Sequence, residues 1–381
     1  MRSSSLSVLT IAHNAVAASN RGRTDALRKL PGVAVSLLTP EWWFEEGRRI
    51  EVPPSAGWRV GRTMFTENGT RHFYLSGLLA AVRETRPDVI DVYEEPFSVV
   101  ALQTLVARDL LAPQAALVVY SAVNVMRKWR WPYRAIERHV LRHADGAHAP
   151  NQDVPRILRA KGFGDKPVAV IPLGIDVERF ASAEAADLAG IPRPRVGFVG
   201  RLEPVKGLDV LMDAYRRLET PASLVVAGDG SERHRLQGAS VHVLPPVTYA
   251  RLPGFLKSLD VLVLPSVTIL PMHREQFGRV LVEAMAAGVP VIGSSSGAIP
   301  EVIGDAGLVV PERDPAALAQ AIDVVVRDAG LRQRLIEHGF LRARTCCDWS
   351  VVADQTLHLF RAAVAGRHGA PNLEPVGSTP R

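Results

Sequence analysis

Short apolar runs rich in Val, Ile and Leu alternate with amphipathic stretches of helical period along the first half of the chain. We predict strands at residues 6–12, 33–38, 89–93, 117–120 and 168–172. Helices are expected between them, at residues 24–30, 75–86, 98–111, 133–142 and 154–161. Strands and helices in this alternation are typical of βαβ units, which build a parallel sheet covered by helices.

The second half repeats this rhythm, with strands predicted at residues 195–199, 224–227, 261–264, 290–293 and 308–310. A chain of 381 residues is long enough for two domains that each bury a core. We therefore predict an α/β protein with two Rossmann-like domains, each a doubly wound parallel sheet.

The first domain is expected over residues 1–176 and the second over residues 190–347, with a linker within 174–194. Asp348, Trp349 and Ser350 are expected to cap a last helix at residues 351–364. Residues 367–381 are rich in Gly and Pro and lack periodicity, so we expect a mobile tail there.

Composition narrows the class of protein further. Hydrophobic residues make up 47% of the chain, as in globular α/β proteins. No apolar run is long enough to span a membrane and no signal segment opens the chain, so we expect a cytoplasmic protein. Cys346 and Cys347 are adjacent, which disfavours a disulfide between them, and we expect them to be packing residues. The net charge of +6 is compatible with nucleic acid, anionic lipid or a phosphorylated substrate.

Two carboxylates, Glu275 and Glu283, stand eight positions apart across the start of a predicted helix. If the helix begins near Gly278, its first amides and its dipole favour an anion such as a diphosphate. The amides expected to face that anion belong to Gly278, Arg279, Val280 and Leu281. The carboxylates could then accept hydrogen bonds from sugar and ribose hydroxyls. The alternative is an ordinary amphipathic helix with two solvated glutamates.

A basic pair follows the strand predicted at residues 195–199, in the segment that runs from Gly200 and Arg201 to Lys206 and Gly207. The planar fork of Arg201 and the point charge of Lys206 suit the two phosphates of a nucleotide. A surface turn is the alternative.

The chain continues after Glu283 with Ala-Met-Ala-Ala-Gly-Val-Pro-Val-Ile and then with Ser-Gly-Ala-Ile-Pro-Glu at residues 296–301. With the two motifs above, this segment resembles the carboxyl-terminal signature of retaining GT-B glycosyltransferases of family 4 (glycosyl transferases group 1). The resemblance implies the GT-B fold, with an interdomain cleft and a last helix, residues 350–366, that crosses back to complete the first domain. It also implies sugar transfer with retention from a UDP- or GDP-sugar to an unidentified glycan, lipid-linked or small-molecule acceptor.

The resemblance assigns Glu275 to the transferred sugar, Glu283 to the ribose, and Arg201 and Lys206 to the developing phosphate charge. A later segment places Val247 near the base. These cations replace a metal, so no metal or cofactor besides the donor is expected, and the D-x-D motif of metal-dependent GT-A enzymes is absent from the sequence.

The amino-terminal half departs from the family pattern at two places. The loop at residues 13–23 lacks the double glycine of many members, and Arg21 or Arg23 could reach a phosphate there or be solvated. Where many relatives carry a histidine, this chain has Ser121 to Asn124. Asn124 is our substitute for contacting the donor sugar, with a loop cap as the alternative and His13 as a weaker candidate.

Two further segments of the first half leave alternatives open. Glu94 and Glu95 end a predicted strand, where they could orient acceptor hydroxyls or begin the next helix. Residues 126–143 mix cations with aromatic rings, which fits either an anionic membrane on the inner face of the cell or an arginine-rich surface. No nucleic-acid partner is expected. The functional alternatives are a non-catalytic protein that binds sugar nucleotides and a GT-B-fold epimerase.

Overall fold

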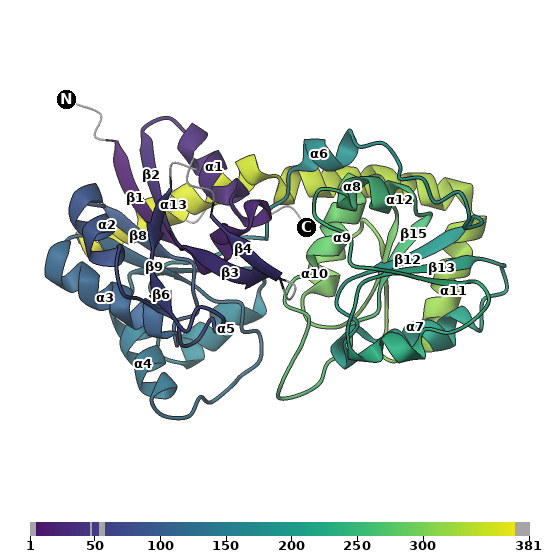
Figure 1. Ribbon diagram of the computed structural model, residues 1–381, viewed down its shortest axis with the longest axis horizontal. Coiled ribbons are helices and arrows are strands. Elements are labelled where there is room, and N and C mark those ends of the chain that lie inside the picture. The colour runs from purple at the N-terminus through teal and green to yellow at the C-terminus, as the bar shows by residue number, and fades with distance from the viewer. Residues whose placement is uncertain (1–4, 46–47, 53–57, 370–381) are drawn as a thin grey trace. The chain divides into compact units, whose positions relative to one another are not determined.

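The computed structural model describes residues 5–45, 48–52 and 58–369 and divides into two compact units (Figure 1). The first unit comprises the chain up to residue 123, residues 127–171 and the chain from residue 352. The second comprises residues 124–126 and 172–351. Asn124, predicted within the first domain, is therefore grouped with the second unit.

A six-stranded parallel sheet forms the centre of the second unit, with the strand order β14-β13-β12-β15-β16-β17. In chain order the strands are β12 (Arg195–Val199), β13 (Ser223–Ala227), β14 (Val241–Leu244), β15 (Val261–Leu264), β16 (Val291–Ser294) and β17 (Leu308–Val310). The helices beside it are α6 (Val177–Ala181), α7 (Leu208–Tyr215), α8 (Leu252–Lys257), α9 (Arg279–Ala286), α10 (Ile299–Ile303), α11 (Pro315–Arg327) and α12 (Ala329–Arg342). The strand order reverses between β12 and β15, and ligands of such sheets bind beyond the carboxyl ends of the strands at this point.

A seven-stranded parallel sheet forms the centre of the first unit, with the order β11-β10-β9-β8-β1-β2-β5. Its strands are β1 (Leu6–Ile11), β2 (Val33–Pro40), β5 (Arg59–Gly61), β8 (Val89–Val92), β9 (Ala116–Tyr120), β10 (Gly146–Ala149) and β11 (Val168–Val170). Its helices are α1 (Gly22–Lys29), α2 (Leu78–Thr85), α3 (Val99–Leu111), α4 (Tyr133–His143) and α5 (Asp153–Ala160). The unit also contains two separate two-stranded antiparallel sheets, β3 (Trp42–Glu45) with β4 (Arg48–Glu51) and β6 (Thr63–Met64) with β7 (Phe73–Tyr74).

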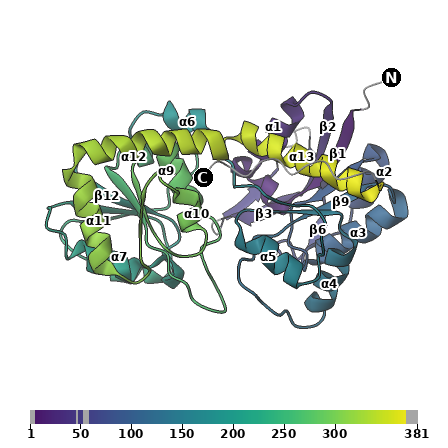
Figure 2. The same ribbon diagram turned by 180° about the vertical axis from the view of Figure 1, so that it is seen from behind.

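The last helix, α13 (Trp349–Arg367), begins in the second unit, and from Val352 onward it belongs to the first (Figure 2). It covers strand β10, where a Cβ atom added to Gly146 would lie 3.2 Å from Ala363 and 3.6 Å from Leu359. The small residues of β10 therefore allow α13 to pack closely against this strand. Arg367, predicted to open the mobile tail, ends α13 and donates to Asp145 at 3.0 Å. The rest of the predicted tail from residue 370 lies outside the described residues.

The predicted class, α/β with two doubly wound parallel sheets, is confirmed. All ten predicted strands are present, within two residues at each end. Strand β10 was missed because Gly-Ala-His-Ala has no β-branched residue, although its neighbours β9 and β11 pair with it on both sides. Helix α6 lies inside the predicted linker, where Asp176 caps it by accepting from the Arg179 amide.

Among the described residues, no helix combines the length and the apolar character needed to cross a membrane.

Candidate functional site

Two loops leave the second sheet where its strand order reverses. The loop after β12 carries Arg201 and ends in the short 3-10 helix η4 (Pro204–Lys206), and the loop after β15 runs from Pro265 to Gly278. The loops touch through their backbones, because a Cβ atom on Gly207 would lie 2.0 Å from the carbonyl oxygen of Pro265. Gly207 also has a φ of +66°. No other residue type fits this contact, which brings the two predicted motifs together.

Lys206 and Glu275 form the centre of this site. The Lys206 Nζ atom donates to Glu275 Oε2 at 2.6 Å, and the Ser266 hydroxyl donates to the same oxygen at 2.7 Å. The two charged side chains are only 15% and 8% exposed. Burial alone would raise the pKa of Glu275, but Lys206 and Ser266 hold this pKa below its ordinary value. The carboxylate is therefore ionised at neutral pH and oriented by two donors.

The main chain of Glu275 is held as firmly as its side chain. Its carbonyl oxygen accepts the Asn124 Nδ2 amide at 2.8 Å and the Ala298 amide at 2.9 Å. A Cβ atom on Gly297 would lie 2.1 Å from that oxygen, so a larger residue would push the loop away. Asn124, predicted to contact the donor sugar, is buried and uses this N–H to position Glu275.

Arg201 is the most open cation of the site. Its side chain is 67% exposed and donates to Glu203 at 3.0 Å. Gly200 precedes it directly after β12 and donates its amide to Ala227 at 3.1 Å. The exposed guanidinium can leave Glu203 for an incoming phosphate at small cost, because exposed ion pairs contribute little to stability.

The first turn of helix α9 differs in one respect from the prediction. Gly278 is its N-cap, as expected, with a left-handed backbone, but the Leu281 amide donates to the Gly278 carbonyl at 2.9 Å. Leu281 is also fully buried. Of the four amides predicted to face an anion, the Leu281 amide thus already has a backbone partner, because the first turn is tight enough to close on itself. The anion contact of the four amides stays a prediction.

Glu283 lies in the second turn of α9 and is 3% exposed. Burial raises its pKa, although Arg279 and Arg179 act in the opposite direction. The Arg279 Nε atom lies 3.1 Å from Glu283 Oε1, and the guanidinium of Arg179 lies 4.4 Å above the ring of Tyr249. The buried carboxylate and the cations suit the polar groups of a nucleoside, and the aromatic ring suits its flat base.

Four residues around this site were not predicted from the sequence: Ser266, His273, Tyr249 and Arg179. Burial lowers the pKa of His273. The charge of Glu275 raises this pKa, and the charge of Lys206 lowers it. Val247, predicted near the base, follows β14 and packs half-buried against the core of the second unit. None of the four unpredicted residues lies in one of the sequence motifs, so only the fold brings them to the site.

The first sheet reverses its strand order between β1 and β8. Asp91 lies there, fully buried, and accepts from Arg23 at 2.5 Å and from the Thr10 hydroxyl at 3.1 Å. Burial would raise the pKa of Asp91, but Arg23 and His148 lower it to about 2. The solvated interpretation is wrong for Arg23, which is only 6% exposed, and the phosphate interpretation of Arg21 or Arg23 stays a prediction. Arg23 is a buried ion-pair partner, and Arg21 donates to the carbonyl of Ala15 at 2.7 Å.

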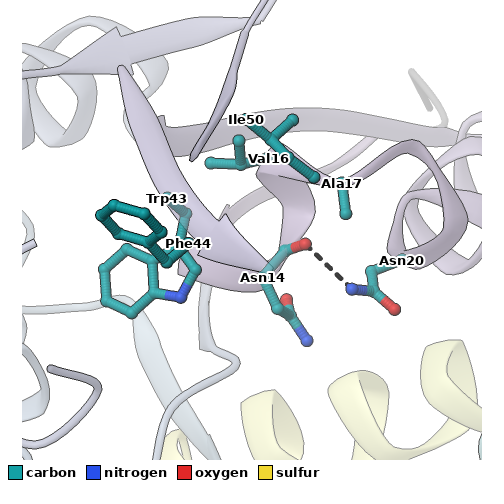
Figure 3. A pocket seen from close by; sticks show the side chains of 7 residues that line it. All are labelled: Asn14, Val16, Ala17, Asn20, Trp43, Phe44 and Ile50. Atoms are coloured by element: carbon teal, nitrogen blue, oxygen red, sulfur yellow. Dashed lines mark hydrogen bonds between the residues drawn. The ribbon is translucent and has the colours of Figure 1, made fainter. Parts of the chain in front are cut away.

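Glu94 and Glu95 follow β8 and do not begin the next helix, whose N-cap is Ser98. Glu95 accepts from the Ser121 hydroxyl and the Ala122 amide, both at 2.8 Å. Glu94 contacts His13. A small cavity of about 120 Å³ lies between the loop after β1 and the strands β3 and β4 (Figure 3). Its lining residues are Asn14, Val16, Ala17, Asn20, Trp43, Phe44 and Ile50.

Comparison with known proteins identifies the family of the chain. Residues 193–328 match the family model described as glycosyl transferases group 1, and residues 24–179 match that of glycosyltransferase family 4. The phosphatidyl-myo-inositol mannosyltransferase of Mycobacterium leprae is 30% identical over 356 residues, which cover 89% of each protein.

Solved structures share the fold at low sequence identity. A glycosyltransferase from Rickettsia africae aligns with a TM-score of 0.71 at 15% identity, over 94% of this chain and 98% of that one. The Anabaena protein HepE, solved in complex with UDP and glucose, aligns with a TM-score of 0.68 at 18% identity, over 94% and 100% of the two chains. With two Rossmann-like sheets and these matches along both halves, the chain belongs to glycosyltransferase family 4 and is a glycosyltransferase of the GT-B fold.

Proposed function

We propose that the protein transfers a sugar from a nucleotide diphosphate to an acceptor hydroxyl, with retention of the anomeric configuration. One observation carries the proposal: Lys206 and Glu275 are paired at the reversal point of the second sheet, beside Arg201 and the first turn of α9. Cations and helix amides suit a diphosphate, and a fixed carboxylate suits sugar hydroxyls.

In the proposed reaction, the acceptor oxygen bonds to the anomeric carbon on the face from which the diphosphate leaves. The bond between that carbon and the phosphate oxygen breaks, and the acceptor proton passes to an oxygen of the departing phosphate. Lys206 and Arg201 stabilise the negative charge that grows on the phosphate, so no metal is assigned to this step. Glu275 holds the sugar through its hydroxyls, and Glu283 accepts from the ribose.

The donor and acceptor classes are also proposals. We assign a UDP- or GDP-sugar as donor, with Val247 and Tyr249 on the side of the base. The Mycobacterium leprae relative is a phosphatidyl-myo-inositol mannosyltransferase by name, and its name supports a lipid-linked acceptor here. Glycans and small molecules remain the other acceptor classes.

A donor panel tests the proposed function. UDP- and GDP-sugars are incubated with the protein, and nucleoside diphosphate release is measured with and without candidate acceptors, followed by assignment of the product anomer by NMR. We expect one donor to be consumed and a product of unchanged configuration. Conversion of a donor into its epimer without an acceptor would favour an epimerase. Tight binding of a donor without turnover on any acceptor would favour a non-catalytic binding protein.

The raised pKa of Glu283 predicts how nucleotide binding depends on pH. Below that pKa the carboxyl gains a proton and loses its charge, so nucleotide affinity should fall as the pH falls. Because burial raises the pKa, the decline should begin above the ordinary value of 4.5.

The measurement is the dissociation constant of UDP and of GDP as a function of pH for the wild type and for Glu283→Gln. The nucleotide phosphates titrate too, and the ratio of the two constants removes that contribution. A ratio that stays flat from pH 5 to pH 8, roughly the range over which a raised glutamate pKa would act, would contradict the ribose assignment.

We further propose that residues 126–143 bind an anionic membrane surface, so that the protein is cytoplasmic and peripheral to the inner face of the membrane. Helix α4 buries Ile136, Val140 and Leu141 and exposes Arg134, Arg138 and Arg142. Trp131 is 84% exposed, whereas Trp129 packs on Phe97 with ring centroids 4.0 Å apart. An exposed ring among cations fits a membrane interface.

Replacing four basic residues of this segment with alanine should weaken binding to anionic vesicles by up to about 1,000-fold, since each contributes about 1 kcal/mol at a charged surface and every 1.4 kcal/mol is about tenfold. The four residues are Arg127, Lys128, Arg130 and Arg134. A matched control removes four exposed arginines of the second unit, Arg216, Arg217, Arg334 and Arg344. Vesicle sedimentation at low and physiological salt is the measurement. Equal losses in both variants, or no binding by the wild type at low salt, would contradict the proposal.

A further inference from the structure

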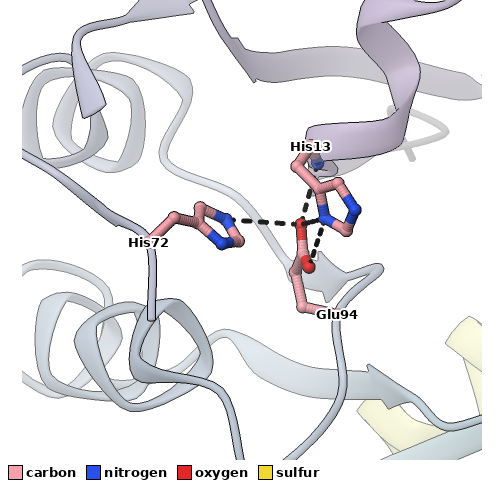
Figure 4. Close-up of side chains that lie close together, drawn as sticks. All are labelled: His13, His72 and Glu94. Atoms are coloured by element: carbon pink, nitrogen blue, oxygen red, sulfur yellow. Dashed lines mark hydrogen bonds and ion pairs between the residues drawn. The ribbon is translucent and has the colours of Figure 1, made fainter. Parts of the chain in front are cut away.

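Three side chains from separate segments of the first unit converge where its sheet reverses (Figure 4). His13 follows β1, Glu94 follows β8, and His72 lies immediately before β7. One potential ligand atom from each lies within 4.8 Å of the others. His72 and Glu94 are fully or almost fully buried, and His13 is 24% exposed.

His72 is the unusual member of this cluster. Its Nδ1 atom lies 3.3 Å from the carbonyl oxygen of Asn68, which can only accept, so Nδ1 carries the proton. Its Nε2 atom is buried and has no hydrogen-bond partner among the described residues. This nitrogen faces Glu94 Oε1 at 3.7 Å, which is too long for a hydrogen bond. A buried polar atom without a partner is costly, so a ligand between the two atoms would stabilise the site.

We propose that His13, His72 and Glu94 bind a divalent transition-metal ion, with zinc as the best match. Two imidazoles and one carboxylate are a ligand set that zinc accepts. Metal–ligand bonds of about 2.1 Å at a tetrahedral angle separate ligand atoms by about 3.4 Å, close to the distance between His72 and Glu94. In this structure, His13 Nδ1 lies 2.6 Å from both oxygens of Glu94 and donates to the carboxylate. Metal binding would release that proton to solvent. The His13 ring, whose side chain is 24% exposed, would have to shift away from Glu94 to make room for the ion.

The surroundings hold the ligands in place. The His13 amide donates to Glu94 Oε1 at 2.8 Å, and the Trp43 ring lies 4.2 Å from the His13 ring. Three protein ligands leave a fourth position for water or for a hydroxyl. Trp43 also lines the cavity of Figure 3, so that cavity and the ion would share one wall. The proposed metal site belongs to the first unit. It is not the diphosphate site of the second unit, where Arg201 and Lys206 are expected to take the place of a metal.

The test uses the chain of 381 residues without a histidine tag. Zinc content is measured by elemental analysis after exhaustive dialysis, and Co²⁺ titration is followed by visible absorption. We expect one equivalent of metal per chain and a rise in melting temperature on zinc addition. His72→Ala and Glu94→Gln should each lower Co²⁺ affinity by about 100-fold or more, because each removes a direct ligand.

His234→Ala serves as the matched control, since His234 is exposed and lies in the second unit. His72→Gln provides a second variant should His72→Ala melt at a much lower temperature. The proposal would be overturned if the wild type held no more metal than the His72 variants. It would also be overturned if the folded His72 and Glu94 variants bound Co²⁺ as tightly as the wild type. Neither outcome depends on sugar-nucleotide turnover, so this test is independent of the proposed activity.

Discussion

Replacing Lys206 with alanine should lower turnover by about 100-fold or more, because a cation facing developing charge in a water-poor site contributes several kcal/mol. Lys206 is the cation held closest to the fixed carboxylate, 2.6 Å from Glu275. Arg201→Ala should have an effect of the same order if the guanidinium turns from Glu203 to the diphosphate. The measurement is the turnover number at saturating donor.

Loss of Lys206 also leaves a buried carboxylate whose remaining side-chain donor, among the residues that the structure describes, is Ser266, and this loss can destabilise the fold. Lys206→Gln separates the two effects, since its amide can still donate to Glu275 but carries no charge. We expect Lys206→Gln to melt closer to the wild type and to turn over as slowly as Lys206→Ala. Arg216→Ala, which removes an exposed arginine paired with Asp213, is the control for Arg201. Turnover near the wild-type value in a folded Lys206 or Arg201 variant would remove that residue from the catalytic assignment.

Glu275→Ala and Glu283→Ala should fail in different ways. Glu275 is assigned to the sugar, which changes in the transition state, and Glu275 also orients Lys206. Its loss should therefore mainly lower the turnover number, by about 100-fold. Glu283 is assigned to the ribose, which does not react. Its loss should mainly weaken donor binding, by roughly ten- to hundredfold for a hydrogen bond to a charged group.

Steady-state kinetics with varied donor, together with nucleotide binding measured separately, distinguish the two outcomes. Gln variants at both positions preserve side-chain volume and remove the charge, although one accepting oxygen becomes a donating amide nitrogen. If Glu275→Ala lost donor affinity and kept its turnover number, the division between the two glutamates would be wrong.

The sequence predicted the second unit well because its site is built from two contiguous motifs. Apolar runs located β12 and β15, and the loops after them contain Lys206 and Glu275. In a parallel sheet whose order reverses between these strands, both loops meet at one edge. The local alternation of apolar and polar positions was therefore enough to bring the lysine and the glutamate to one site.

The first unit could not be predicted in the same detail. His13, His72 and Glu94 come from separate segments, and no spacing along the chain links them. Arg23 was expected at the surface or on a phosphate. Its buried ion-pair partner, Asp91, lies on strand β8, where the sequence predicts an ordinary core strand. The same holds for Asn124, whose hydrogen bond to Glu275 joins distant parts of the sequence. Such contacts depend on tertiary packing.

The most direct test of the central claim is calorimetric titration of UDP and GDP into the wild type and into three variants of the second unit: Lys206→Gln, Glu283→Ala and Arg216→Ala. The account predicts that one nucleotide binds the wild type and Arg216→Ala equally, and binds the Lys206 and Glu283 variants at least about tenfold more weakly. Failure of both nucleotides to bind the wild type, or equal affinity for all four proteins, would contradict a nucleotide site at the reversal point of the second sheet.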